Sequence, residues 1–135
     1  MWYAFFYVII REKEKITMAK QYFGDFNTLK SVFIENPAMD RQIFYGDKIM
    51  LGRNIIKAGT VVPMHKHPEE QISYVISGEC DVIIEGEEPR RCKAGAVAWF
   101  PADVGHEVRV YDEDTEILDI FNPVREDWLE LFGEK

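Results

Sequence analysis

Cysteine is scarce in this sequence of 135 residues. The two cysteines, Cys80 and Cys92, are too few for the disulfide framework that stabilises small secreted domains. Nothing else in the composition points to an oxidising compartment, so we expect a cytoplasmic protein. Isolated cysteines within short apolar strands are typical of buried thiols rather than metal ligands.

Basic residues are also in the minority. Lys and Arg together number 16 against 24 Asp and Glu, which gives a formal net charge of −8 and a pI near 4.9. Proteins that bind nucleic acids need a basic surface to meet the phosphates, and the same repulsion disfavours anionic membranes. The charge balance therefore argues against nucleic acid and membrane as partners.

No apolar run approaches the length of a membrane-spanning helix. Trp2–Ile10 is nine residues long, against the roughly 20 that a bilayer requires. Charges of mixed sign follow this run instead of preceding it, unlike a signal peptide. Residues 1–17 are therefore interpreted as an N-terminal extension, either a start assigned too early, before Met18, or an additional strand. Residues 18–135 have the length of a single domain.

Internal repeats, low-complexity tracts and linkers are absent too, and turn signals instead recur every eight to twelve residues. Short runs rich in β-branched residues lie between them: Ile49–Ile56, Gln71–Ile76, Cys80–Ile84, Val97–Phe100, Glu107–Val110 and Glu116–Phe121. Regularly spaced short strands predict an all-β sandwich or barrel. Only residues 125–132 have helical spacing, which predicts a short C-terminal helix packed over the outside or mouth of the barrel.

Histidine is rare as well, and all three copies fall where a metal site can form. Prolines bracket His65 and His67 and disfavour a helix, so the pair lies in extended chain with both imidazoles on one face. Gln71 shares that face if the chain stays extended, and His106 stands at the start of a later strand. Two neighbouring ligands plus a distant one is how a β-barrel assembles a mononuclear site. We therefore expect one bound divalent ion.

These histidines belong to two longer motifs. The motifs are Gly59-x5-His65-x-His67-x3-Gln71-x6-Gly78 and Gly95-x5-Pro101-x-Asp103-x2-His106-x3-Val110. They resemble the two motifs of the cupin family, G-x5-H-x-H-x3/4-E-x6-G and G-x5-P-x-G-x2-H-x3-N. The resemblance covers residues 59–110 and implies a small jelly-roll barrel, also called a double-stranded β-helix.

The chain departs from the cupin pattern at three positions, with Gln71 in place of Glu, Asp103 in place of Gly and Val110 in place of Asn. The last two concern a turn and a strand end. Gln71 replaces an anionic ligand by a neutral amide, whose oxygen can still coordinate a metal. A centre with only neutral ligands favours non-redox chemistry on a carboxylate or enolate over oxygen activation. A barrel that has lost its metal is the alternative.

The end of the chain sharpens the resemblance. Residues 119–127 read DIFNPVRED, and HPEEQ spans residues 67–71. Within the cupins this combination is similar to the KdgF type, whose members open the ring of 4,5-unsaturated uronic acids to give linear keto-uronates. The resemblance implies metal ligands at His65, His67, Gln71 and His106, and substrate-surrounding residues at Asp119, Phe121 and Arg125.

The implied roles are chemically coherent. Asp119 and Phe121 are two residues apart on the last strand, so their side chains point to the same face of the sheet. We expect this face to be the barrel interior. Arg125 can hold a uronate carboxylate with its planar fork, and Asp119 can move a proton as an enol becomes a ketone. Simpler interpretations stay open: Asp119 as a strand-end carboxylate, Phe121 as a core residue, and Arg125 as the partner of an acidic residue in the terminal helix.

Three functional hypotheses follow. The leading one is a metal-dependent, non-redox enzyme of the lyase or isomerase type that acts on a small sugar acid, with a carboxylate as substrate. The second is a non-catalytic cupin that binds or senses a ligand, and the third is another cupin reaction, namely dioxygenation, isomerisation or β-elimination. Ni, Zn, Mn and Fe(II) all accept imidazole-rich sites. The abundance of aromatic and β-branched residues predicts a homodimer.

Overall fold

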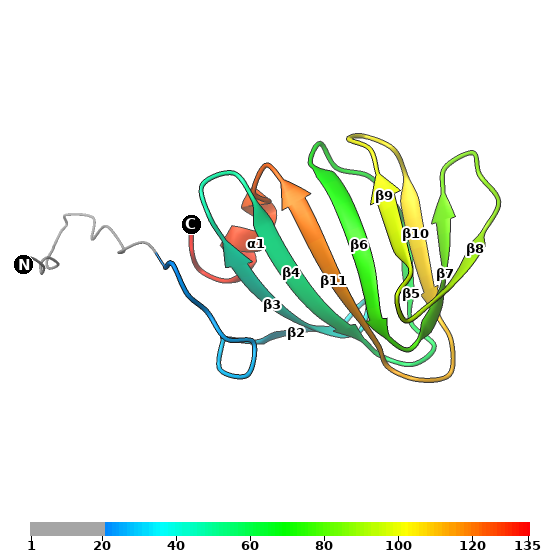
Figure 1. The fold of residues 1–135 in the computed structure, drawn as a ribbon, viewed down its shortest axis with the longest axis horizontal. Coiled ribbons are helices and arrows are strands. Elements are labelled where there is room, and N and C mark those ends of the chain that lie inside the picture. Colours follow the sequence, from blue (N-terminus) through cyan, green and yellow to red (C-terminus); the bar gives the residue numbers. More distant parts are fainter. Residues whose placement is uncertain (1–20) are drawn as a thin grey trace, which may run out of the picture.

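A computed structural model describes residues 21–135, which form short strands joined by tight turns (Figure 1). The strands are β2 (Val32–Ile34), β3 (Met39–Tyr45), β4 (Met50–Ile56), β5 (Val61–His65), β6 (Glu70–Ser77), β7 (Glu79–Ile84), β8 (Arg90–Lys93), β9 (Val97–Phe100), β10 (His106–Val110) and β11 (Thr115–Asn122), and the helix is α1 (Glu126–Leu131). The extension predicted over residues 1–17 lies outside the described residues.

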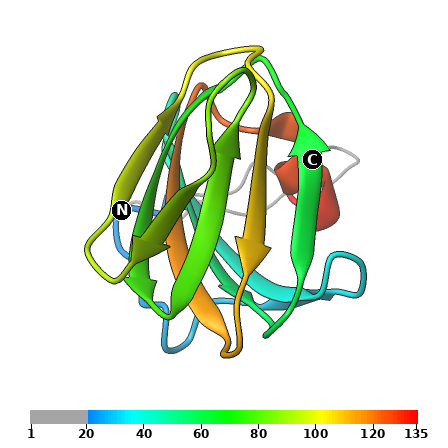
Figure 2. The same ribbon diagram turned by 90° about the vertical axis from the view of Figure 1, so that its right-hand side faces the viewer.

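The strands build two antiparallel sheets that face each other. The larger sheet has the order β2-β3-β4-β11-β6-β9 and the smaller one β5-β10-β7-β8. Figure 2 shows the smaller sheet in front of the larger. From β4 onward the chain crosses repeatedly between the two sheets, which confirms the predicted all-β jelly-roll fold with a short C-terminal helix.

The helix α1 packs on β3 and β4 at one end of the larger sheet (Figure 1). Gly52 on β4 makes this approach possible, because a Cβ there would lie 2.3 Å from Cζ3 of Trp128. Within residues 21–135, no helix has the length and apolar character needed to cross a membrane.

Two apolar clusters form the core, and the site lies between them. One fills the space between the sheets and includes Phe100, and the other lies beneath α1 and includes Phe121. The ring of Phe100 stacks on His106 at a centroid distance of 4.1 Å, and Phe121 contacts His67 edge-on at 5.7 Å. Each cluster therefore holds one histidine of the predicted metal site in place.

Period-two alternation positions the inward side chains of β6 and β11. Gln71 and Ser73 are buried on β6, Asp119 and Phe121 are buried on β11, and Tyr74 is exposed. The parity predicted for Asp119 and Phe121 is confirmed. The outer face of β6 and β9 exposes Ile72, Tyr74, Val97 and Trp99. The homodimer stays a prediction.

Six strands match the predicted runs to within one residue at every end, whereas β2, β3, β5 and β8 were not predicted. β8 consists mostly of basic residues, and β5 contains Pro63, so neither resembles an ordinary strand. Cys80 and Cys92 face each other across β7 and β8 as buried free thiols, as predicted. Burial raises the pKa of the Cys80 thiol to about 12.

Candidate metal centre

The fold brings the three histidines together at one end of the barrel. His65 ends β5 and His106 begins β10, and the two residues are direct partners in the antiparallel register. His67 follows β5 in the loop that leads to β6. One ring nitrogen from each histidine lies within 4.8 Å of the others, so the three side chains are positioned to bind a metal ion.

The protonation of the three rings is fixed by the backbone. Each Nδ1 lies within hydrogen-bonding distance of a main-chain carbonyl: His65 with Pro63 at 2.8 Å, His67 with Glu69 at 3.0 Å, and His106 with Val104 at 3.1 Å. A carbonyl can only accept, so Nδ1 carries the proton and Nε2 keeps its lone pair. Nε2 of His106 is buried and has no hydrogen-bond partner among the described residues. A metal ion accounts for this otherwise unsatisfied atom.

Burial also favours the neutral form of His67 and His106. It lowers the pKa of His106 to about 4, and it lowers the pKa of His67, with Arg125 acting in the same direction. Neutral imidazole is the form that coordinates a metal, because a proton and a metal ion compete for the same lone pair. At neutral pH the centre is therefore ready to accept a cation.

Gln71 presents its carbonyl oxygen to this centre. Its Nε2 donates to Oγ of Ser73 at 2.9 Å and to Oδ1 of Asp119 at 3.0 Å, which fixes the orientation of the amide. Oε1 therefore lies 3.0 Å from Nε2 of His67. Since both of these atoms are acceptors, a cation shared between them removes the repulsion of their lone pairs. The donor set thus fits a metal ion.

The route by which Gln71 reaches the centre differs from the prediction. The sequence-based argument placed it on the histidine face of one continuous extended segment. In the structure the chain turns after His67, and Gln71 belongs to β6 in the opposite sheet. The parity argument is therefore wrong, although the side chain lies where it was expected.

Asp119 sits at the centre of a buried hydrogen-bond network. Its Oδ1 accepts from Oγ of Ser73 at 2.5 Å and from Gln71, and its Oδ2 accepts from Nδ2 of Asn54 at 2.7 Å. Burial raises the pKa of this carboxyl, while the hydrogen bonds and the charge of Arg41 act in the opposite direction. Asp119 is thus not a simple strand-end carboxylate on the surface.

Arg125 lies beside the centre but is already paired. Its Nε and Nη2 donate to the two carboxylate oxygens of Asp127 at 3.1 and 2.7 Å, and Glu69 lies 3.9 Å away. The guanidinium also lies over the rings of Phe121 and Trp128, 5.2 and 4.9 Å from their centroids. The pairing with an acidic residue of the terminal helix, which the sequence left open, is therefore present.

Arg41 and Asn54 are site residues that were not predicted from the sequence. They lie opposite each other on β3 and β4, and Nε of Arg41 donates to Oδ1 of Asn54 at 2.7 Å. Both line a cavity of about 60 Å³ together with His65, His106 and Asp119. A polar Asn within a predicted apolar strand was the one available signal, because β3 itself was not predicted.

Asp103 occupies the turn position where the cupin motif has glycine. Its φ of 62° is left-handed, a conformation that Asp tolerates better than most residues. Its N–H donates to the carbonyl of His67 at 2.9 Å, which ties the two histidine loops together. The departure from the motif thus preserves the turn.

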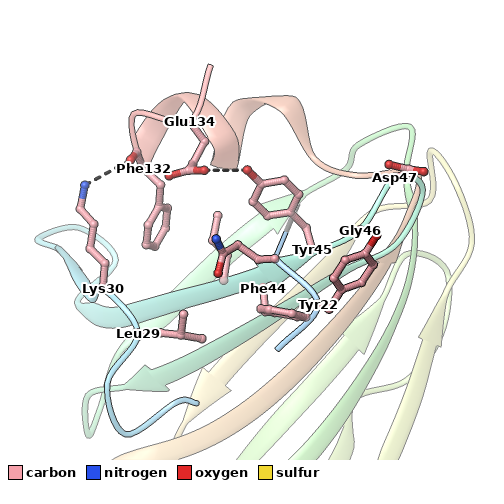
Figure 3. A pocket seen from close by; sticks show the side chains of 11 residues that line it. Tyr22, Leu29, Lys30, Phe44, Tyr45, Gly46, Asp47, Phe132 and Glu134 are labelled. Atoms are coloured by element: carbon pink, nitrogen blue, oxygen red, sulfur yellow. Dashed lines mark hydrogen bonds between the residues drawn. The ribbon is translucent and has the colours of Figure 1, made fainter. Parts of the chain in front are cut away.

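A larger hollow, of about 540 Å³, lies apart from the histidines (Figure 3). It is bounded by β3, by the first described residues and by the C-terminal end, where Tyr45 donates to Glu134 at 2.6 Å and Lys30 donates to the carbonyl of Phe132 at 3.1 Å. None of the predicted site residues lines it. We therefore place the chemistry in the smaller cavity.

Comparisons with known proteins agree with this geometry. A family model described as the cupin domain matches residues 53–121. The dimethylsulfoniopropionate lyase DddQ of Ruegeria pomeroyi is 38% identical over 55 residues, which cover 41% of this chain but only 27% of that protein. The pectin degradation protein KdgF of Dickeya dadantii is 33% identical over 88 residues, covering 64% of this chain and 79% of that protein.

A solved structure of KdgF from a Halomonas species gives a TM-score of 0.73 at 27% identity, over 82% of this chain and 100% of that one. The family model spans about half of the present chain, and the KdgF of D. dadantii is matched over most of its length. This chain therefore belongs to the cupin family, as a small cupin that resembles KdgF.

Proposed function

We propose that this protein is a metal-dependent, non-redox enzyme that opens 4,5-unsaturated uronates to linear keto-uronates. The observation that carries the proposal is the hydrogen bond from Gln71 to Asp119, which places a buried carboxyl directly beside the histidine cluster. The likeness to two KdgF proteins, one of them named for pectin degradation, supports the choice of substrate.

In this proposal His65, His67 and His106 hold one divalent ion through Nε2, and Gln71 holds it through Oε1. The bound ion supplies Lewis acidity toward an oxygen atom of the substrate. Imidazole-rich sites accept Ni, Zn, Mn and Fe(II), so the donor set is compatible with each of them.

The reaction requires two proton transfers. Opening the ring breaks the bond between the anomeric carbon and the ring oxygen, and the anomeric hydroxyl loses a proton as the carbon becomes an aldehyde. The former ring oxygen leaves as an enolate, and C4 gains a proton as the enolate becomes a ketone. One proton leaves and one arrives, so substrate and product are isomers. Asp119 is suited to this exchange, because burial favours its protonated form.

The volume of the cavity limits how much of a substrate can enter. At about 60 Å³ it has room for an ion and a few atoms, but not for a whole sugar ring. A uronate therefore places only its reacting edge between the histidines and Asp119, while Phe121 and Arg125 contribute to the wall. The role of Arg125 in binding the carboxylate stays a prediction.

The proposal is tested by following the absorbance of the conjugated C=C bond of unsaturated galacturonate and of an alginate-derived monomer. We expect the metal-loaded protein to remove this absorbance faster than buffer or chelator-treated protein does. If the loaded protein is inert on every unsaturated uronate, the substrate assignment is wrong. Binding without turnover would favour the non-catalytic cupin.

Gln71→Glu is expected to keep the metal but lose activity. The amide group of Gln71 donates to Asp119 at 3.0 Å, so a glutamate places a second carboxylate oxygen against the first. Like charges at this distance raise the pKa of the pair, and the anionic ligand weakens the Lewis acid. A pKa change of one unit alters the ionised fraction about tenfold, so we expect turnover to fall roughly tenfold or more.

The control for this variant is Ser73→Ala, which removes one hydrogen bond to Asp119 without adding a charge. The hydrogen bond from Ser73 lowers the pKa of Asp119, so both variants should shift the pH–rate profile upward, and the shift should be larger in Gln71→Glu, which adds a charge. Wild-type turnover with an unchanged profile would show that the neutral amide is not required.

A further inference from the structure

Arg41 is a second arginine of the pocket, and no sequence motif pointed to it. It lies in β3 on the inner side of the larger sheet, opposite Asn54 of β4. It lines the same cavity as His65 and Asp119. Its position is therefore on the far side of the Asp119 network from the histidines.

The contacts of Arg41 involve neutral groups. Nε donates to Oδ1 of Asn54 at 2.7 Å and Nη2 to the sulfur of Met39 at 3.3 Å. The guanidinium carbon lies 3.5 Å from the ring centroid of Trp128, a cation–π contact. Within the described residues, Nη1 donates to no acceptor, and no carboxylate forms an ion pair with Arg41.

Four other arginines of the described chain behave differently, whereas Arg90 on β8 is exposed to solvent and forms no ion pair with a described residue. Each of the four has a carboxylate within ion-pair distance: Arg53 with Glu116, Arg91 with Glu79, Arg109 with Glu107, and Arg125 with Asp127. In Arg125 both of the paired nitrogens face Asp127, so its fork is occupied. Arg41 is thus the pocket cation that has no carboxylate partner of its own.

A partly buried guanidinium without such a partner is electrostatically unfavourable. Burial lowers the pKa of Arg41 to about 10, which leaves it charged at neutral pH. Asp119 and Asp127 act on it through space, and Arg125 repels it. Asn54 lies between Arg41 and Asp119 and hydrogen-bonds to both, so no carboxylate of the described residues is hydrogen-bonded directly to the guanidinium.

We propose that Arg41 binds the carboxylate of the substrate and makes the pocket specific for small monocarboxylates. The guanidinium binds the anion at its edge through a charge-assisted hydrogen bond, while Trp128 packs against its face. Arg41 then contacts one end of the reacting edge of the substrate, and the histidine cluster lies at the other end. The uronate as ligand rests on the proposed function, whereas the anionic class rests on the unpaired guanidinium.

The test measures binding of galacturonate, a saturated uronate that cannot undergo the reaction, to the metal-loaded protein by calorimetry. Arg41→Gln is expected to weaken binding about 10- to 100-fold, the range for removing a charge-assisted hydrogen bond. The neutral methyl ester of galacturonate should bind the wild type and the variant equally. Arg41→Lys keeps the charge and should restore part of the affinity.

Two further variants complete the design. Arg41→Met keeps the apolar contact with Trp128 if Arg41→Gln does not fold, and Arg109→Gln is a matched control, because Arg109 is exposed and pairs with Glu107. Equal affinity of wild type and Arg41 variants for galacturonate would overturn the proposal. The proposal would also be overturned if the Arg41 variants lost equal affinity for galacturonate and its methyl ester, or if the wild type did not bind galacturonate. A loss of affinity in Arg125→Gln alone would overturn it as well.

The design separates this inference from the proposed function. If Arg41 variants lose galacturonate while the wild type is inert on all unsaturated uronates, the anion site stands and the ring-opening activity is wrong. If the wild type opens uronates and the Arg41 variants keep full affinity, the activity stands and Arg41 is not the anchor.

Discussion

Replacing His106 with alanine is expected to abolish stoichiometric metal binding while the barrel remains folded. His106 supplies a buried Nε2 with no other partner among the described residues, and its Nδ1 is already held by the carbonyl of Val104. Loss of a supporting partner alone lowers metal affinity roughly 10- to 100-fold, so loss of the ligand should exceed that range. Elemental analysis of the purified variant, before and after reloading with a divalent ion, measures the effect.

Two companion variants show whether a loss of metal in His106→Ala reflects the missing ligand or a failure to fold. His65→Ala removes another ring of the cluster at an exposed position, so it should lose metal with little effect on stability. Phe100→Leu disturbs the ring that stacks on His106 but leaves all three histidines, so it should keep the ion. A folded His106→Ala protein that still binds one ion per chain with wild-type affinity would contradict the metal centre.

Asp119→Asn is expected to reduce turnover by roughly 10²- to 10⁴-fold, the usual loss for a positioned acid or base. The single oxygen of the new amide can still accept from Ser73 and Gln71, so Gln71 keeps its orientation toward the histidines, whereas the new NH2 group faces Nδ2 of Asn54 and loses that hydrogen bond. Metal content and ligand affinity should therefore stay close to wild type. Initial rates at saturating substrate, with metal content measured on the same samples, separate the two effects.

The matched control is Asp81→Asn, because Asp81 is also on a strand and accepts a hydrogen bond from Tyr111, but does not line the cavity. It should leave turnover unchanged. If Asp119→Asn turned over at the wild-type rate, Asp119 would have a structural role and the proton-transfer mechanism would be wrong.

The parts of the site that lie on alternating strands were predictable from sequence. β11 buries every second residue, so parity alone placed Asp119 and Phe121 inside. The pairing of His65 with His106 also follows from a two-sheet fold, because it brings two distant motifs onto neighbouring strands. Here local pattern and tertiary structure agree, which is why the prediction succeeded.

The region around β3 was not predictable in the same way. Its inner face carries Arg41, and its other side carries Gln42, whose amide donates to the carbonyls of Phe26 and Leu29. Polar residues on both covered faces remove the period-two signal that identifies a strand. Arg41 and its role were therefore visible only after the fold had placed β3 against β4.

Gln71 and Arg125 show a second limit of sequence reasoning. Spacing along one strand suggested the right neighbour for Gln71 by the wrong route, because a turn between sheets brings it to His67. For Arg125, the motif position implied binding of a substrate carboxylate, and pairing with an acidic residue of the terminal helix stayed open; in the structure Arg125 pairs with Asp127, two residues further along the chain. An arginine can pair with a carboxylate of the protein or with one of the substrate. The choice depends on three-dimensional geometry, which the spacing of residues in the sequence does not encode.

The most direct test of metal-dependent ring opening uses one preparation of the protein, stripped with a chelator and then given increasing amounts of a divalent ion. Bound metal and the initial rate of absorbance loss with unsaturated galacturonate are measured at each step. The account predicts a rate that rises in proportion to bound metal and levels off at one ion per chain. A stripped protein that works at the full rate, or a loaded protein no faster than buffer, would contradict it.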